Sequence, residues 1–156
     1  MWLEEHLRHS RGYGIHSPFL YRIVREAMMP RRVTGSERGL YEALLGRGVS
    51  KRTARRLQNL HTLEQYENWS IDRTQGAEGR VFVVLTEGCD QGYIGTIQRA
   101  LRERGGVVVV LHEGWCRRQR ALRNTLVKEH HSMSAEKRGF TLLFSREDLR
   151  KQHIII

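Results

Sequence analysis

Two short apolar segments constrain the fold more than any other feature of the sequence. Residues 81–85 (VFVVL) and 107–111 (VVVVL) are continuous, mostly β-branched runs bounded by turn-forming residues. This pattern is typical of strands that are buried on both faces. Helical periodicity over residues 93–104 and 116–129 places a helix after each run. The order strand, helix, strand, helix predicts parallel strands joined by right-handed crossovers.

Helices are also expected before the first of these strands. Apolar residues recur at helical spacing from 18 to 29, 36 to 45 and 50 to 66. Ser17 and Ser50 are suited to cap the first and the third of these helices. The N-terminal part of the chain is therefore predicted to be helical.

Three further strands are expected around the two central ones. Residues 140–144 and 153–156 are predicted to close the sheet with antiparallel strands. Residues 68–72 form a short strand whose pairing with residues 81–85, parallel or antiparallel, is left open. The predicted fold class is α/β, a reduced Rossmann-like sheet with a mostly parallel core, antiparallel C-terminal strands and preceding helices. We expect residues 1–67 to pack on the sheet portion, residues 68–156, as one domain overall.

Composition excludes several classes of protein. The longest apolar runs are too short to cross a bilayer, so no membrane association is expected. The first ten residues include Glu4 and Glu5 and have no apolar core, so no secretory signal is expected. Cys89 and Cys116 do not make a disulfide framework, which fits a reducing compartment. These features together predict a cytoplasmic protein.

The chain is strongly basic, with a formal charge of +10, and 23 of its 27 basic residues are arginine. Such a charge attracts polyanions, and arginine binds phosphate well. Two groups share helix faces at spacings of three and four. The nucleic-acid-binding candidates are Arg52, Arg55, Arg56, Arg117, Arg118, Arg120 and Arg123. The simpler interpretation, which we favour, is that these are solvated helix faces.

Acidic residues follow both apolar runs at matching positions. Residues 83–88 (VVLTEG) and 109–114 (VVLHEG) are near copies, so Glu87 and Glu113 are expected side by side at the carboxyl edge of the sheet, where α/β proteins bind ligands. With His112 they are the catalytic candidates, because carboxylates, a histidine and nearby thiolates can share a proton or bind a divalent metal. We favour the alternative that Glu-Gly marks a strand exit, and we predict no metal site.

Three terminal motifs resemble a known family. Residues 14–21 (GIHSPFLY), 139–146 (GFTLLFSR) and 149–153 (LRKQH) are similar to the opening and the ending of a bacterial class I S-adenosylmethionine-dependent methyltransferase family. Residues 81–115 resemble that family's fourth and fifth strands with the helix between them, so the resemblance covers about two-thirds of the chain. It implies a methyltransferase sheet and, if the activity is retained, S-adenosylmethionine as cofactor.

The departures from the family concern the cofactor site. The family has an acidic residue and a Gly-x-Gly loop after its first strand, and residues 73–79 (RTQGAEG) match that loop poorly. No room exists for the family's second and third strands. The family's acidic residues and Ile-His-Trp after its fifth strand are matched here only by Trp115. The resemblance therefore implies a shortened member that lacks most of the cofactor-binding half.

A few positions remain as weak cofactor-binding candidates. They are His16, Asp72, Gly76 and Glu87. His16 has a second interpretation, which we favour, in which it packs against its own helix. Among the other histidines, the pair His130 and His131 is predicted to lie in a solvated turn, and His61 in the core.

Three functions are compatible with these observations. The first is a degenerate methyltransferase-like protein that serves as a binding or regulatory module and needs no cofactor. The second is an active methyltransferase with a reduced pocket, and the third is an arginine-rich nucleic-acid-binding protein. The partner is unidentified, either a nucleic acid or a protein. A sheet without its outer strands exposes an edge, which a homodimer would cover.

Overall fold

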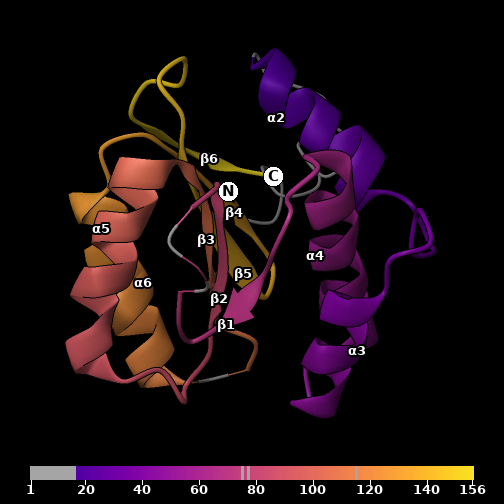
Figure 1. Cartoon of the computed structure of the whole chain (residues 1–156), viewed down its shortest axis with the longest axis horizontal. Helices are drawn as coiled ribbons and strands as arrows, with labels where there is room; N and C mark the ends of the chain where they lie inside the picture. The colour runs from indigo at the N-terminus through magenta and orange to yellow at the C-terminus, as the bar shows by residue number, and fades with distance from the viewer. Residues whose placement is uncertain (1–16, 75, 77, 115) are drawn as a thin grey trace. The chain divides into compact units, whose positions relative to one another are not determined.

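The computed structural model describes residues 17–74, 76, 78–114 and 116–156 of the chain. The chain divides into two compact units. Helical segments up to Gln65, together with the last two residues, belong to the first unit. The sheet and its two long helices belong to the second, which runs from Tyr66 to Ile154 (Figure 1).

The first unit is helical, as predicted. Its segments in chain order are α2 (Pro18–Ile23), the π-helical turn η1 (Val24–Met28), α3 (Gly39–Gly46) and α4 (Lys51–Leu63). Both predicted caps are confirmed: Ser17 Oγ accepts from the Leu20 amide and Ser50 Oγ from the Thr53 amide. The expected helix over residues 18–29 is in fact one α-helical segment that continues with π-helical hydrogen bonding.

A buried asparagine anchors the irregular segment between α2 and α3. Asn59 of α4 is fully buried. Its side-chain nitrogen donates to the carbonyl oxygens of Ala27 and Arg32, and its oxygen accepts from the Thr34 amide at 2.8 Å. These bonds satisfy backbone groups that no helix ladder pairs. His61, on the same helix, is 6% exposed, which confirms its predicted place in the core.

The second unit is built on six strands and two long helices. The strands are β1 (Ser70–Ile71), β2 (Val81–Leu85), β3 (Gly106–Leu111), β4 (Met133–Lys137), β5 (Phe140–Ser145) and β6 (Gln152–Ile155). The helices are α5 (Ile94–Arg104), which follows the 3₁₀ turn η2 (Gln91–Tyr93), and α6 (Arg117–Glu129). This order matches the predicted alternation of strands and helices.

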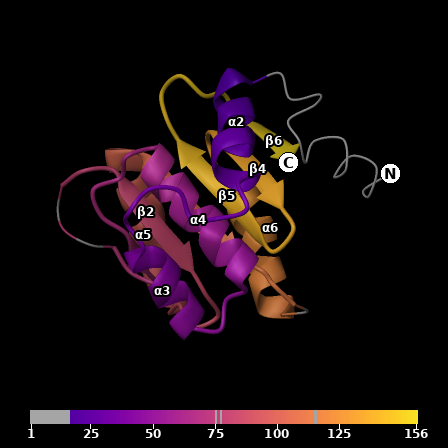
Figure 2. The ribbon, with the colours of Figure 1, turned by 90° about the vertical axis from the view of Figure 1, so that its right-hand side faces the viewer.

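The sheet has the strand order β1-β2-β3-β5-β4-β6. The first three strands are parallel, with Ser70 opposite Val83 and Val83 opposite Val108, so the open question of the pairing of β1 is resolved as parallel. β5 is antiparallel to β3 and to β4, and Figure 2 shows β5, β4 and β6 side by side. The α/β, Rossmann-like fold with a parallel core and antiparallel C-terminal strands is confirmed.

Both α5 and α6 pack on one face of the sheet. Alternate residues of the strands point to that face, and the two helices place their apolar residues against them. The resulting core consists of Val81, Val83, Leu85, Cys89, Ile94, Ile97, Leu101, Val108, Val110, Leu122, Leu126 and Leu143. All residues of β2 and β3 are buried, as the continuous apolar runs predict.

Strand β4 was not predicted. Its sequence, MSAEK, has no apolar run, and apolar and polar residues alternate only over residues 133–136. Pairing with β5 holds this segment in a strand, with Ala135 opposite Leu142 and Glu136 opposite Thr141. The neighbouring prediction of a solvated turn is wrong for His130, which is 8% exposed, because its Nε2 bonds to the Phe144 carbonyl oxygen at 2.6 Å.

Candidate functional site

The carboxyl edge of the parallel strands is occupied by the chain itself. Gln119, in the first turns of α6, is 2% exposed. Its Nε2 donates to the carbonyl oxygen of Leu111 at 2.9 Å and to that of Leu85 at 3.3 Å. These two carbonyls end β3 and β2, where a ligand of an open α/β sheet would otherwise bind. The amide of Gln119 therefore bridges the two strand ends.

A carboxylate ties the end of β1 to the end of β2 in a similar way. Asp72 directly follows β1 and has a positive φ of 61°, a conformation that Asp adopts more readily than most residues. Its Oδ1 accepts from the Thr86 amide at 2.6 Å, and its Oδ2 accepts from the Thr86 hydroxyl. Asp72, a weak cofactor candidate, is thus engaged within the protein.

The catalytic candidates follow adjacent strand ends, as predicted, but have different surroundings. Glu87 and Glu113 are both exposed. His112 is partly buried, and its Nε2 lies 2.9 Å from the hydroxyl of Thr141 on β5. Burial, followed by the charge of Arg123, lowers the pKa of His112, which favours its neutral form. The histidine is held by the sheet.

The thiol at this edge is not activated. Cys89 is 2% exposed. Burial, together with the nearby Asp72 and Asp90 carboxylates, raises the pKa of the Cys89 thiol, so the thiolate is disfavoured. Among the described residues, no group of three or more histidine, cysteine, aspartate or glutamate side chains is placed to hold a metal ion.

The remaining cofactor candidates do not form a site with these residues. His16 and Trp115 lie outside the described residues. Gly76 belongs to the loop before β2, and its carbonyl oxygen accepts from Arg104. The same guanidinium donates to the carbonyl oxygens of Glu78 and Gly79 at 2.7 and 2.8 Å. Arg104 thereby holds this loop against the end of α5.

Several arginines of the nucleic-acid candidates bind groups within their own unit. On α4, Arg55 donates to the Arg31 carbonyl oxygen and Arg56 to that of Met28. Burial, with the charges of Arg52 and Arg55, lowers the pKa of Arg56 to about 10. Such a guanidinium is part of the fold and poorly placed to meet a phosphate.

Two arginines of α6 also bind groups within their own unit. Arg118 donates to the Cys89 carbonyl oxygen, and Arg123 forms a 2.7 Å ion pair with Glu136 of β4. Arg117, Arg118 and Arg120 are exposed, and so is Arg52 of α4. The predicted basic face of α6 therefore keeps three arginines at the surface.

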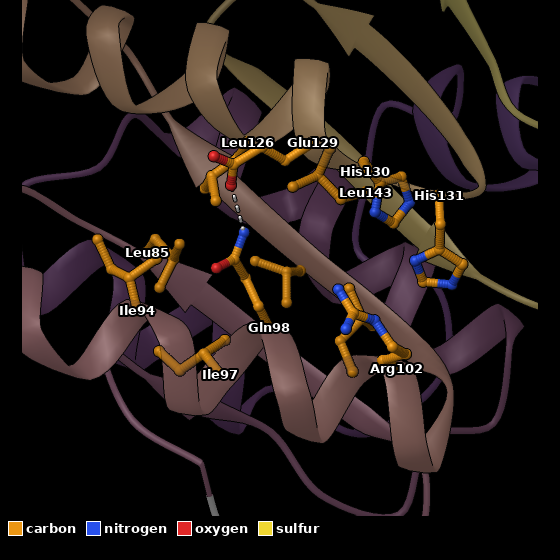
Figure 3. Close-up of a pocket in the computed structure, with 12 residues that line it drawn as sticks. Leu85, Ile94, Ile97, Gln98, Arg102, Leu126, Glu129, His130, His131 and Leu143 are labelled. Atoms are coloured by element: carbon orange, nitrogen blue, oxygen red, sulfur yellow. Dashed lines mark hydrogen bonds between the residues drawn. The ribbon is translucent and has the colours of Figure 1, made fainter.

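A small groove lies between α5 and α6 (Figure 3). Its floor and walls are aliphatic, formed by Leu85, Ile94, Ile97, Leu101, Val108, Leu126 and Leu143. Its polar lining consists of Gln98, Arg102, Glu129, His130 and His131. These aliphatic side chains belong to the core and are exposed by 8% or less, so the groove leaves little room for a ligand.

One hydrogen bond crosses the groove from helix to helix. Gln98 Nε2 on α5 donates to Glu129 Oε2 on α6 at 3.3 Å, drawn as the dashed line in Figure 3. The carboxylate of Glu129 is thereby paired at this crossing.

One end of the groove is basic. Figure 3 shows Arg102, His130 and His131 gathered there. Arg102 is exposed and has no hydrogen bond or ion pair with the described residues. Lys151 Nζ, bound to the Lys128 carbonyl oxygen, adds positive charge near His130. Burial, opposed by the bond to Phe144 O, lowers the pKa of His130.

Sequence reasoning missed Gln119, the groove and the role of His130. A single glutamine in an arginine-rich helix carries no signal of its own, although its spacing of three from Leu122 places it on the buried face. The groove arises from the distance between two helices, which periodicity does not encode. The paired histidines between α6 and β4 were the one signal that could have pointed to the role of His130. They directly precede β4, a strand that the sequence did not predict.

No family model, curated protein or solved structure matches this chain. Among the described residues, no helix combines the length and the apolar character that crossing a membrane requires.

Proposed function

We propose that this protein is a methyltransferase-like protein with a degenerate cofactor site. On this proposal, the carboxyl edge of the sheet has lost conventional S-adenosylmethionine binding, and the protein acts as a binding or regulatory module. The sequence motifs and the Rossmann-like sheet support the methyltransferase-like part of the proposal.

The bridging amide of Gln119 is the observation that carries the proposal. A cofactor at this edge would have to displace a buried side chain from two strand-end carbonyls. Displacement would remove the Gln119 hydrogen bonds to Leu85 O and Leu111 O unless the cofactor supplied a donor, and a buried group left unsatisfied costs about 1–3 kcal/mol. The Asp72–Thr86 bonds and the raised pKa of the Cys89 thiol point the same way.

Calorimetric titration with S-adenosylmethionine and with its demethylated product tests this proposal. We expect no heat of binding at millimolar ligand. A dissociation constant in the low micromolar range corresponds to about −8 kcal/mol and requires a formed pocket. That result would favour the alternative of an active methyltransferase with a reduced pocket, and Glu87, Glu113 and His112 would then be the residues to substitute.

Nucleic-acid binding is a second candidate, favoured by the charge of +10 and by the exposed Arg117 and Arg120. It predicts affinity for RNA that falls steeply with salt and weakens when both arginines become alanine. A single-charge control is Arg118→Ala, to be compared with Arg117→Ala alone, because its guanidinium is bound to Cys89 O. Binding that ignores both salt and the double substitution would remove this candidate.

A further inference from the structure

We infer that the helical unit binds a single strand of nucleic acid, with the ring of Tyr21 stacked on a base and nearby arginines on the phosphates. We name the contact region the η1/α4 surface, and it consists of Tyr21, Arg25, Met29, Arg31, Arg32 and Arg52. The inference goes beyond the proposed function, because it concerns the other unit of the chain and does not depend on the state of the sheet edge.

The surface is continuous because α4 packs along η1 and the segment that follows it. Arg56 of α4 donates to the Met28 carbonyl oxygen at 3.2 Å, and Arg55 donates to that of Arg31 at 3.1 Å. Arg52 lies one turn before Arg56, and its charge is one cause of the lowered pKa of Arg56. The guanidinium groups of Arg55 and Arg56 therefore hold the segment after η1 beside the start of α4.

The exposed apolar side chains lie along the helix that α2 and η1 form. Tyr21 is 47% and Met29 is 37% exposed, and these are the two exposed large hydrophobic side chains among the described residues. Arg25 lies four residues from each, a spacing that places helical residues on one face, and its Nη1 is 3.6 Å from Met29 Sδ. An exposed aromatic ring beside a guanidinium is the arrangement on which unpaired bases stack.

The exposed arginines of this surface have no carboxylate partner. The ion pairs of the helical unit among the described residues are those of Arg22 with Glu26 and Glu64. Four exposed arginines form no ion pair with any residue that the structure describes: Arg25, Arg31, Arg32 and Arg52. Like charges on one surface repel one another, and a bound polyanion would offset that repulsion.

The positive charge of the chain is concentrated in the helical unit. Residues 17–65 contain ten basic and four acidic residues, a net charge of +6, whereas residues 66–154 contain fifteen and eleven, a net charge of +4. The helical unit is also the shorter of the two. Its field therefore favours an anionic partner more strongly than the field of the sheet unit does.

Two features favour a single strand of nucleic acid over other polyanions. The ring of Tyr21 can stack on a base only where that base is not already stacked inside a duplex. The planar fork of arginine matches the geometry of a phosphate. A membrane-binding helix would present a continuous apolar stripe, whereas here Arg25 stands between Tyr21 and Met29.

Fluorescence anisotropy of a labelled oligouridylate of about twelve nucleotides, titrated with the full chain, tests the inference. We expect a dissociation constant of about 10 µM at about 50 mM salt. Four phosphate contacts on a single strand give a log-log salt slope of about −3, so affinity should fall about 50-fold on going to about 200 mM salt. Polyglutamate of matched charge should bind at least about fivefold more weakly, because it offers no base to stack.

Variants separate the stacking contact from the phosphate contacts. Tyr21→Ala should weaken oligouridylate binding by at least about fivefold without changing the salt slope, and should leave binding of a duplex of the same length unchanged. Tyr21→Phe, which keeps the ring, should bind like the wild type. Arg31→Ala/Arg32→Ala should reduce the magnitude of the salt slope by about 1.4, since two phosphate contacts are lost.

The matched control for charge is Arg99→Ala/Arg102→Ala. It removes two exposed arginines of α5 that form no ion pair with any described residue, so it lowers the net charge equally and should leave the slope unchanged. The inference is overturned if no oligouridylate binds, if polyglutamate binds as tightly, if Tyr21→Ala binds like the wild type, or if the two double variants lower the slope equally.

The test is also distinct from those of the proposed functions. Oligouridylate binding that is weakened only by Arg117→Ala/Arg120→Ala would place the contact on α6 and overturn the inference for the η1/α4 surface. Every one of these outcomes leaves the proposed loss of cofactor binding as it stands, because titration with S-adenosylmethionine tests that loss separately.

Discussion

The carboxyl edge and the α5/α6 groove belong to the same sheet, yet they differ in how their polar groups are used. At the edge, the side chains of Gln119 and Asp72 form hydrogen bonds with the ends of the protein's own strands. At the groove, Arg102 has no partner among the described residues, and an apolar floor lies beside it. The difference indicates that position at the usual ligand edge of an α/β sheet does not make a site.

The largest effect is expected at the wall of the groove. Leu126 on α6 is 3% exposed and belongs to the core on the helix-covered face. Leu126→Ala should lower the free energy of unfolding by about 2–5 kcal/mol, because it removes buried methyl groups and leaves a cavity. Urea denaturation measures the change, and Leu126→Met, which conserves volume, should cost less than about 1.5 kcal/mol. A loss below that value for alanine would mean that this wall is loosely packed.

Substitution of the bridging glutamine tests the closed edge directly. Gln119→Leu keeps the volume but removes the side-chain donor to two strand-end carbonyl oxygens, so unfolding should become easier by about 1–3 kcal/mol. Gln98→Leu is the matched control on the groove side, since its bond to Glu129 is exposed, and should change stability by less than about 0.5 kcal/mol. Equal effects of the two substitutions would contradict the difference between the regions.

A smaller effect is expected at the end of β1. Asp72→Asn preserves a residue that tolerates positive φ but removes the charge that accepts from Thr86. We expect a loss of about 1 kcal/mol, since charge-assisted hydrogen bonds are the stronger ones. Faster hydrogen exchange of the Thr86 amide would locate the effect at this edge, and unchanged exchange would show that Asp72 does not hold the strand end.

The smallest effect concerns the pH dependence set by His130. Its folded pKa lies below that of the unfolded chain because of burial. As the pH falls below about 6.5, the unfolded state binds a proton that the folded state resists, and stability is lost. The lowered pKa of His112 acts in the same direction.

Denaturation at pH 7.5 and 5.5 checks this expectation. His130→Gln should reduce the loss of stability between the two values, and His131→Gln serves as the matched control at the exposed neighbour. If His130→Gln retained the full loss of the wild type, burial of His130 would not be a source of the pH dependence.

Sequence reasoning succeeded where burial on both faces leaves a continuous apolar run. Residues 81–85 and most of β3 were recognised for that reason, and the caps Ser17 and Ser50 were found because capping is local chemistry. β4 was missed because Ser134 and Lys137 become buried through tertiary packing, and polar residues by themselves do not indicate a buried strand.

The candidate site was predicted only in part. The parallel pairing of β2 and β3 was expected, and it places Glu87 and Glu113 after adjacent strand ends. The hydrogen bonds of Gln119 link residues distant in sequence, and the position of Arg102 beside His130 depends on how α5 and α6 are spaced. Neither relation has a local signature, so both required the structure.

The most direct test follows the amide resonances of a labelled sample during titration with the demethylated product of S-adenosylmethionine. The account predicts no shifts. Shifts at residues 85–89 and 111–113 would contradict it, because the edge bridged by Gln119 would then be open to a cofactor.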